Sequence, residues 1–520
     1  MAKENRRPIV TAKTLEFAGD YHLPYIHLHN HKGEGLSPDT LGENISSLVV
    51  EMNIYESLFA NCITGTLVIA DTRNLISNLP IQGTERLSFR LSTKLENESP
   101  YTTIDCTESG GHPMHIYALT DKQQISDNLQ TYVLHFASRE FVRNLRLKVS
   151  ESFEGRMDQM VNKIFTDPDY LDSYKTLNYQ KTRNQDKIVV PNLNPFAAIG
   201  MMCQRALPDN ISSKGAGYLF YETTKGFHFR SWESLCVTKG NQLRDAKQRF
   251  RYIQVMQGNP HVDEKEDRTI EGYKNIENYK FISNFHDVAA NTALGTYGHR
   301  VITHNIYDKS YREDDYHYHH SFDDTHHTED WPAIVDTPVD YDTLEGTNRQ
   351  KGVSDYPEAR VSLQPTTRFS HNKDTGHFGT EVTDDGILEG ERRAQINKIH
   401  SATKLEMTVK GQAWLQVGDV VDFDLQSIEN RDKMPTPNKL DTQYSGRYII
   451  THIRHRVAQD QYKQVLTCVK DSVKNGYGYA GKSYTEIAGE PTVSPIFDID
   501  EGYEEPSLSS TSSGTWHPGV

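Results

Sequence analysis

The chain has 520 residues, of which 71 are acidic and 56 basic, so its formal net charge is −15. This length predicts about three to four domains, and no run approaches the ~20 consecutive apolar residues of a membrane helix. An acidic chain also does not favour nucleic-acid binding through counterion release. The five cysteines are far apart and odd in number, which argues against a disulfide framework or a zinc ribbon and fits a reducing site of synthesis.

Strand-like patterns follow an N-terminal extension at residues 1–27. The runs are rich in β-branched and aromatic side chains, and they lie at residues 48–55, 62–69, 85–91 and 131–136. Short strands separated by turns are typical of a barrel or a sandwich. Residues 28–147 are therefore predicted to form a first barrel-like β domain.

The pattern changes to helical spacing after residue 150. One helix is predicted from an apolar stripe that comprises Met157, Met160, Val161, Ile164 and Phe165. It should end at Asp167, because a residue before proline disfavours the α conformation. A second helix should begin at Asn194-Pro195, and residues 217–232 have the pattern of a hairpin. Residues 148–236 are predicted to form a small α+β domain.

Strand patterns return in the second half of the chain, at residues 405–409, 417–423, 448–457 and 462–469. Residues 237–306 and 381–475 are predicted to form a second barrel-like β domain. Residues 307–380 are rich in acidic, His and Tyr residues and poor in aliphatic ones, so they are predicted to be a long surface insertion that buries little. Residues 476–520 are predicted to be a flexible tail.

The segment 476–483 reads GYGYAGKS and matches the P-loop pattern literally. A working P-loop needs a following helix whose N-terminus holds phosphate. Here the next residues reach Pro491 after a short, broken stretch. The match is therefore interpreted as a chance fit of a Gly- and Tyr-rich linker, and ATP binding is rejected.

A histidine tract within the predicted insertion has the residue types of a first-row metal site. It combines several carboxylates with His317, His319, His320, His326 and His327. No rigid scaffold is evident around it, and a metal site needs its ligands held in place. The tract is interpreted as a solvated, pH-sensitive surface loop.

Other catalytic patterns (HExxH, GxSxG and CxxC) are absent from the sequence. Glu140 and Glu151 are interpreted as solvated charges near a helix start, and Trp232 and Trp414 as core residues. The sequence predicts no enzyme, and it marks no catalytic, cofactor-binding or metal-binding residue.

Taken in order, these elements resemble the baseplate central hub protein of contractile-tailed bacteriophages, whose fold is shared with the N-terminal part of type VI secretion spike proteins. The resemblance spans roughly residues 40–470 and rests on short apolar patterns and their order, at residues 45–59, 63–71, 138–147, 417–423 and 446–452. The chain departs from the family pattern in the length of its insertion and tail. It also lacks a long repetitive β-helix, so the spike would be a separate polypeptide.

The resemblance implies a structural virion protein in the tail baseplate, assembled in the host cytoplasm. Such a hub forms a ring that joins the tail tube to the cell-puncturing spike and leaves a channel for DNA ejection. The implied partners are further copies of the chain in a homotrimer, the spike, tail tube and tape-measure proteins, and other baseplate proteins. DNA would pass without specific binding, and no membrane insertion or cofactor is expected. The alternatives are a cell-wall hydrolase or a receptor-binding β protein of a phage tail.

Overall fold

The chain divides into two compact units, Met1–Ala480 and Gly481–Val520, and every described residue belongs to the first. The computed structural model describes residues 17–30, 32, 34, 43–78, 81–93, 102–107, 110, 112–183, 185–209, 215–238, 242–252, 272–283, 286–305, 309, 311–335, 352–366, 370–371, 378–379, 383–426, 440–458 and 461–475. With 47% strand and 17% helix, the protein is mainly β with α+β, as predicted. None of the helices in the described ranges combines the length and apolarity needed to cross a bilayer.

The first β unit contains strands where period-two patterns predicted them, at β3 (Val49–Ser57), β4 (Thr64–Asp71), β5 (Arg86–Ser92) and β8 (Leu129–Ser138). It also contains β1 (Ile26–His29), β2 (Glu43–Asn44), β6 (Thr103–Cys106), β7 (Met114–Ser126) and the short helix α1 (Leu75–Asn78). Every second residue of β4 is buried, so Leu67 and Ile69 enter a core with Phe89 and Phe136. Gly65 is needed because a Cβ there would lie 2.1 Å from the Phe136 ring.

The α+β unit follows directly. Its elements are α2 (Arg139–Arg146), β9 (Ser152–Arg156), α3 (Met157–Thr166), β10 (Leu177–Tyr179), β11 (Gln185–Val189), α4 (Pro195–Cys203), β12 (Tyr218–Thr223), β13 (Gly226–Ser231) and α5 (Glu233–Cys236). Asp167 is extended and ends α3 before Pro168, and Asn194 precedes the proline that opens α4. Both helices and the hairpin of β12 and β13 therefore confirm the sequence predictions.

The second β unit contains β14 (Gln248–Arg251), β15 (Ile276–Ser283), β22 (Thr403–Lys410), β23 (Val420–Asp424), β24 (Gly446–Ala458), β25 (Gln461–Lys470) and β26 (Ser472–Val473). Its core holds the alternating residues of β22, namely Leu405, Met407 and Val409, against Phe423 and Leu466. The strands expected in the last third of the chain are thus present.

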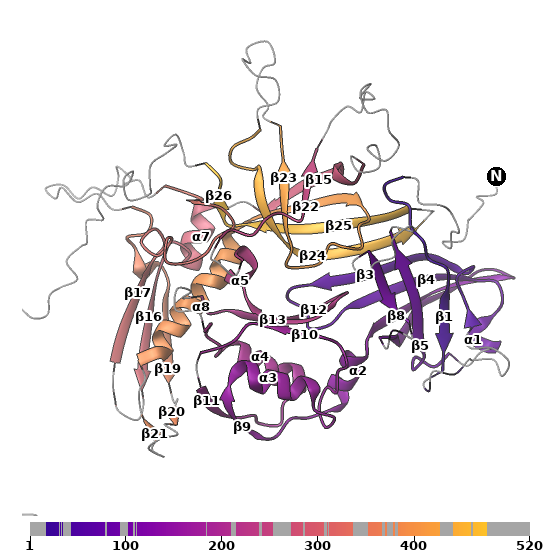
Figure 1. The fold of residues 1–520 in the computed structure, drawn as a ribbon, viewed down its shortest axis with the longest axis horizontal. Coiled ribbons are helices and arrows are strands. Elements are labelled where there is room, and N and C mark those ends of the chain that lie inside the picture. The colour runs from indigo at the N-terminus through magenta and orange to yellow at the C-terminus, as the bar shows by residue number, and fades with distance from the viewer. Residues whose placement is uncertain are drawn as a thin grey trace, which may run out of the picture. The chain divides into compact units, whose positions relative to one another are not determined.

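One continuous sheet joins the two β units. Its strand order is β15-β22-β25-β24-β3-β4-β8-β7-β5-β1-β2, and β14, β23 and β6 lie off this path. The junction is the antiparallel pair β3–β24, which runs from Ser57 opposite His452 to Glu51 opposite Ala458. In Figure 1 the yellow strand β24 lies next to the indigo strand β3, with β25 on the other side of β24. This shared sheet was not predicted from the sequence.

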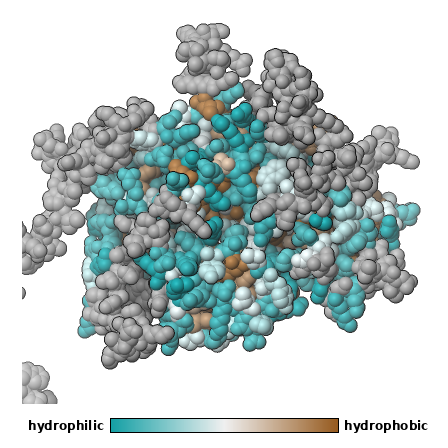
Figure 2. All heavy atoms as spheres, viewed as in Figure 1, coloured by the Kyte–Doolittle hydropathy of each residue, from teal (hydrophilic) through white to brown (hydrophobic). Residues whose placement is uncertain are grey.

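A smaller sheet with strand order β17-β16-β19 lies beside the helix α8 (Thr383–Ser401), as Figure 1 shows. This part of the chain contains α7 (Val288–Leu294), β16 (Gly298–Asn305), β17 (Tyr311–His317), β18 (Trp331–Pro332), the 3-10 helix η2 (Pro357–Ala359), β19 (Val361–Thr366), β20 (Ser370–His371) and β21 (Phe378–Gly379). The sheet therefore crosses the predicted start of the insertion at residue 307. On the face visible in Figure 2, hydrophilic residues predominate and apolar ones form small separate areas.

Candidate functional site

Buried polar clusters lie where segments far apart in the sequence meet, and the first is at the seam between β3 and β24. The side chains of Glu56 and His455 are completely buried there, and Glu56 Oε1 lies 3.1 Å from His455 Nε2. The other ring nitrogen of His455 lies 2.6 Å from the hydroxyl of Tyr462. The backbone N–H of Val417 donates to Glu56. Because one partner comes from each β unit, the cluster fixes the register in which the units join.

A second cluster fastens the α+β unit to the first β unit. Lys175 Nζ donates to Glu222 Oε1 at 2.5 Å and to Glu140 Oε2 at 3.1 Å, and the two carboxylate groups are 1% and 2% exposed. Glu222 also accepts from the Ser138 hydroxyl and from the backbone N–H of Ile63. Glu222 belongs to β12, whereas Ser138 and Ile63 belong to the first β unit, so this carboxylate bridges the two.

Lys175 stabilises both carboxylates, although burial and the charge of Glu140 still raise the pKa of Glu222 above its ordinary value. Burial alone would lower the pKa of Lys175, but Glu222 and Glu140 raise it well above its ordinary value. Burial alone would likewise raise the pKa of Glu140, but Lys175 and the Ser173 hydroxyl hold it below its ordinary value. A cavity of about 100 Å³ adjoins the cluster, lined by Lys175, Glu222 and residues of the first β unit. Both carboxylates already accept hydrogen bonds from Lys175 and from neighbouring groups of the protein. Such an arrangement is typical of a structural ion pair rather than of a catalytic group.

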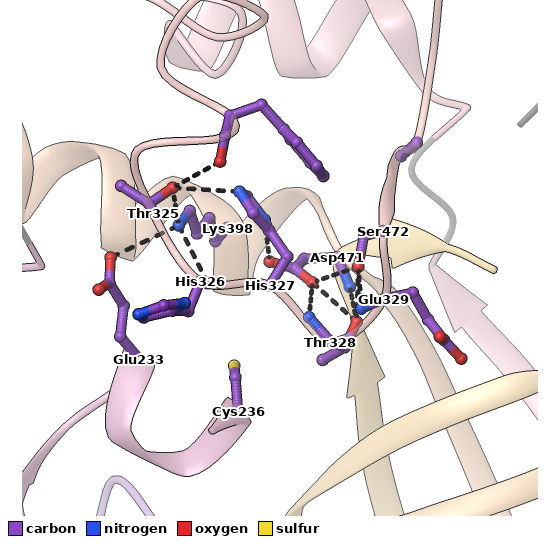
Figure 3. A network of polar contacts seen from close by, with 12 residues as sticks. Glu233, Cys236, Thr325, His326, His327, Thr328, Glu329, Lys398, Asp471 and Ser472 are labelled. Atoms are coloured by element: carbon purple, nitrogen blue, oxygen red, sulfur yellow. Dashed lines mark hydrogen bonds and ion pairs between the residues drawn. The ribbon is translucent and has the colours of Figure 1, made fainter. Parts of the chain in front are cut away.

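A third cluster attaches the histidine tract to the second β unit (Figure 3). His327 Nδ1 lies 2.9 Å from Asp471 Oδ2, and the backbone N–H and hydroxyl of Thr328 both donate to Asp471 Oδ1. The backbone N–H of Glu329 donates to the Ser472 hydroxyl at 2.7 Å. From α8, Lys398 donates to the hydroxyl of Thr325 and lies 3.8 Å from Glu233 of α5.

This third cluster corrects the prediction of a solvated histidine loop. His319 and His327 are 2% and 4% exposed, and Tyr318 and Phe322 form a small core with Tyr297. Burial, and then the positive charge of Lys398, lower the pKa of His327. Burial alone would raise the pKa of Asp471, but His327 holds it well below its ordinary value. The expectation that the predicted insertion buries little is therefore wrong for residues 318–333, whereas every residue of β17 and the side chain of His320 are exposed or half-buried.

The outer edges of the continuous sheet are candidates for contact with other chains. Within the described ranges, β15 pairs only with β22, and β2 pairs only with β1. Most of β15 is exposed or half-buried, and its Ile282 is 53% exposed. An edge strand has backbone groups that another strand can pair. Natural edges also use lysine against unwanted pairing, and Lys280 lies on β15.

The residues singled out from the sequence have different outcomes. Glu140 was expected to be solvated, but it is 2% exposed in the second cluster. Glu151 remains partly exposed and pairs with Lys163 at 2.8 Å, and Trp232 is a core residue, as predicted. The P-loop match at residues 476–483 lies outside the described residues, as does the rest of the predicted tail.

The metal-ligating side chains that the structure describes do not converge on a site. The described part of the chain has no group of three or more His, Cys, Asp or Glu arranged to hold a metal ion. All five cysteines are free thiols. Sequence patterns gave no signal for the three clusters, because their members come from distant segments: Glu56 and His455 are 399 residues apart.

No protein-family model matches the chain, and no curated protein matches it in sequence. Solved structures do resemble it. A tail protein from Neisseria meningitidis is 8% identical, with a TM-score of 0.45 over 87% of this chain and 97% of that one. The prophage MuSo2 tail protein from Shewanella oneidensis is 9% identical, with a TM-score of 0.45 over 86% and 99%. The E. coli c3393 protein, a component of the type VI secretion system, is 9% identical, with a TM-score of 0.31 over 83% and 75%.

These neighbours are the kinds of protein that the sequence resemblance names: phage tail proteins and a type VI secretion component. The identities are below 10% and the TM-scores below 0.5.

Proposed function

We propose that the chain is a structural subunit of a tail baseplate hub, without enzymatic activity. In this role it forms a ring that joins the tail tube to the spike and leaves a channel for DNA. Its partners are further copies of itself, the spike, tube and tape-measure proteins, and neighbouring baseplate proteins, and its location is the virion. The net charge of −15 discourages a passing polyanion from sticking.

The observation that carries this proposal is the continuous sheet across the seam of β3 and β24. Each β unit has a long antiparallel hairpin, β7–β8 in the first and β24–β25 in the second. Backbone pairing and the buried Glu56–His455 contact hold the two units in one fixed register. A ring subunit needs such rigidity, because an error in the angle between its parts accumulates around the ring and prevents closure.

We infer a homotrimer from the same feature. The resemblance to baseplate hub proteins implies a six-fold tail tube and a three-fold spike. Three chains with two β units each present six units to such a tube and three identical faces to such a spike. A closed three-fold ring therefore matches both the six-fold and the three-fold partner, and all copies of the chain remain identical. The edge strands β15 and β2 lie at opposite ends of the strand order, so they suit pairing between neighbouring chains.

Electron microscopy of the purified chain, alone and with its spike protein, tests the proposal. We expect closed rings with a central opening. Two assays identify the rival functions: clearing of a peptidoglycan overlay that is lost when one carboxylate is neutralised, or binding to host surface glycans. Either result without rings would overturn the hub proposal.

A further inference from the structure

A row of basic side chains crosses one end of the second β unit. Arg456 of β24 lies directly opposite Lys463 of β25, and Lys463 lies directly opposite Lys410 of β22. Neighbouring strands are about 4.8 Å apart, and like charges directly opposite one another destabilise a sheet. Arg454, two residues before Arg456 on the same strand, adds a fourth cation. We call these four side chains the basic row.

Two carboxylates neutralise only part of this charge. Glu51 accepts from both arginines, at 3.2 Å from Arg454 and 2.8 Å from Arg456. Glu277 is shared in the same way by Lys410 at 2.6 Å and Lys463 at 2.7 Å. Among the described residues, four cations face two anions, so this part of the basic row has an excess charge of +2 in a chain whose net charge is −15.

The excess charge is accessible. The side chains of Arg454 and Arg456 are 44% and 45% exposed, and those of Lys463 and Lys410 are 31% and 26% exposed. A guanidinium has five N–H donors in a planar fork that suits carboxylates. In the described part of the chain, Glu51 is the hydrogen-bond partner of Arg456, so donors remain for a second carboxylate.

We propose that the basic row is a docking surface for an acidic, extended polypeptide segment. In the docked state, carboxylates of the segment pair with the arginine and lysine groups and remove the like-charge repulsion between neighbouring strands. Glu51 and Glu277 already show this geometry, since each bridges two cations. The inference concerns this surface alone and stands whether or not the chain is a ring subunit.

A peptide fits the charges better than a nucleic acid does. Affinity for nucleic acid grows with the number of phosphates neutralised, and an excess of two cations provides little of it. At long range, the net charge of −15 repels a polyanion more strongly than it repels a short acidic segment, because the segment carries fewer charges. A few carboxylates matched to a few cations are therefore the complementary partner.

Fluorescence anisotropy with a labelled hexaglutamate peptide tests the inference on the full chain. The unmodified chain should bind the peptide at 50 mM salt, and 200 mM salt should weaken binding because the contacts are exposed. The double variant Arg456→Gln/Lys463→Gln should bind about tenfold more weakly, because it removes two exposed ion pairs and each such pair contributes only a modest part of the affinity. Glu51→Gln should instead strengthen binding, because it removes a competing carboxylate.

The matched control is Lys187→Gln on β11. Lys187 is 40% exposed and forms a one-to-one pair with Glu154 at 3.6 Å, so the change should leave peptide binding unaltered. Circular dichroism should show that every variant is folded. The inference is overturned if the unmodified chain does not bind the peptide, if the control weakens binding as much as the double variant, or if a duplex DNA of equal charge binds more tightly.

Discussion

Replacement of Lys175 by methionine should sharply destabilise the attachment of the α+β unit. The lysine side chain is 10% exposed and lies between two carboxylates that are 2% and 1% exposed. Methionine fills a similar volume but supplies no charge, so Glu140 and Glu222 would face each other unpaired. Removing one partner of a buried ion pair costs about 3–5 kcal/mol, which at roughly 1 °C per kcal/mol for the compact unit Met1–Ala480 lowers the melting temperature by about 3–5 °C.

The pH dependence of this loss identifies its cause. In the unmodified chain Lys175 holds the pKa of Glu140 below its ordinary value, so the contribution of Glu140 to stability is present above that value and is lost as the pH falls. In Lys175→Met, burial and mutual repulsion raise the pKa of Glu140 as well, and raise that of Glu222 further above its ordinary value. Folding then favours the protonated forms, and the loss of stability should be smaller at pH 5 than at pH 7.

Scanning fluorimetry of Lys175→Met at both pH values measures the effect, with Lys187→Met as the control. The control removes an exposed one-to-one pair, which contributes about 0–1 kcal/mol. Adding Glu222→Gln to Lys175→Met should recover part of the loss, because it removes one of the two unpaired charges. A drop of less than 2 °C in Lys175→Met, or an equal drop at pH 5 and pH 7, would refute the ion-pair interpretation.

Two further predictions test the packing and the docked histidine tract. Gly65→Ala should destabilise the first β unit by about 1–3 kcal/mol through overpacking against Phe136. A Cβ at Gly200 meets nothing within 4 Å, so the control Gly200→Ala should instead stabilise α4 by about 0.5–1 kcal/mol. Equal melting temperatures for the two variants would contradict this prediction. His327 faces Asp471, Lys398 and Glu233, and its pKa is lowered, so docking should weaken as the pH falls below the ordinary value of about 6.5. Hydrogen exchange at residues 325–330, corrected for its intrinsic rate, should be faster at pH 5 than at pH 7, and His327→Gln should reduce the difference; unchanged protection would argue against this role.

Local patterns in the sequence predicted α3, α4 and several strands of both β units, but not the 19-residue helix α8. The alternation of Leu67 and Ile69 in β4 and the stripe from Met157 to Phe165 in α3 reflect burial on one face of an element, and such burial depends only on neighbours in the sequence. The C-terminal end of α3 and the start of α4 followed from proline, whose effect on the backbone is also local.

Those local patterns did not predict the contacts between elements. The seam joins Glu56 to His455 across 399 residues, and neither residue has a local signature of burial. The histidine tract was misinterpreted because it lacks aliphatic residues, although aromatic rings supply its apolar surface. Phe322 and His327 stack with their ring centroids 3.8 Å apart. An imidazole buried in this way is kept neutral, so its polarity did not exclude it from a core.

Native mass spectrometry of the chain with its spike protein tests the central claim most directly. The two β units share one rigid sheet, so three chains should suffice to close the ring. The account predicts a complex of three chains with three spike subunits. A stable complex of six chains with three spike subunits, or of one with one, would contradict it.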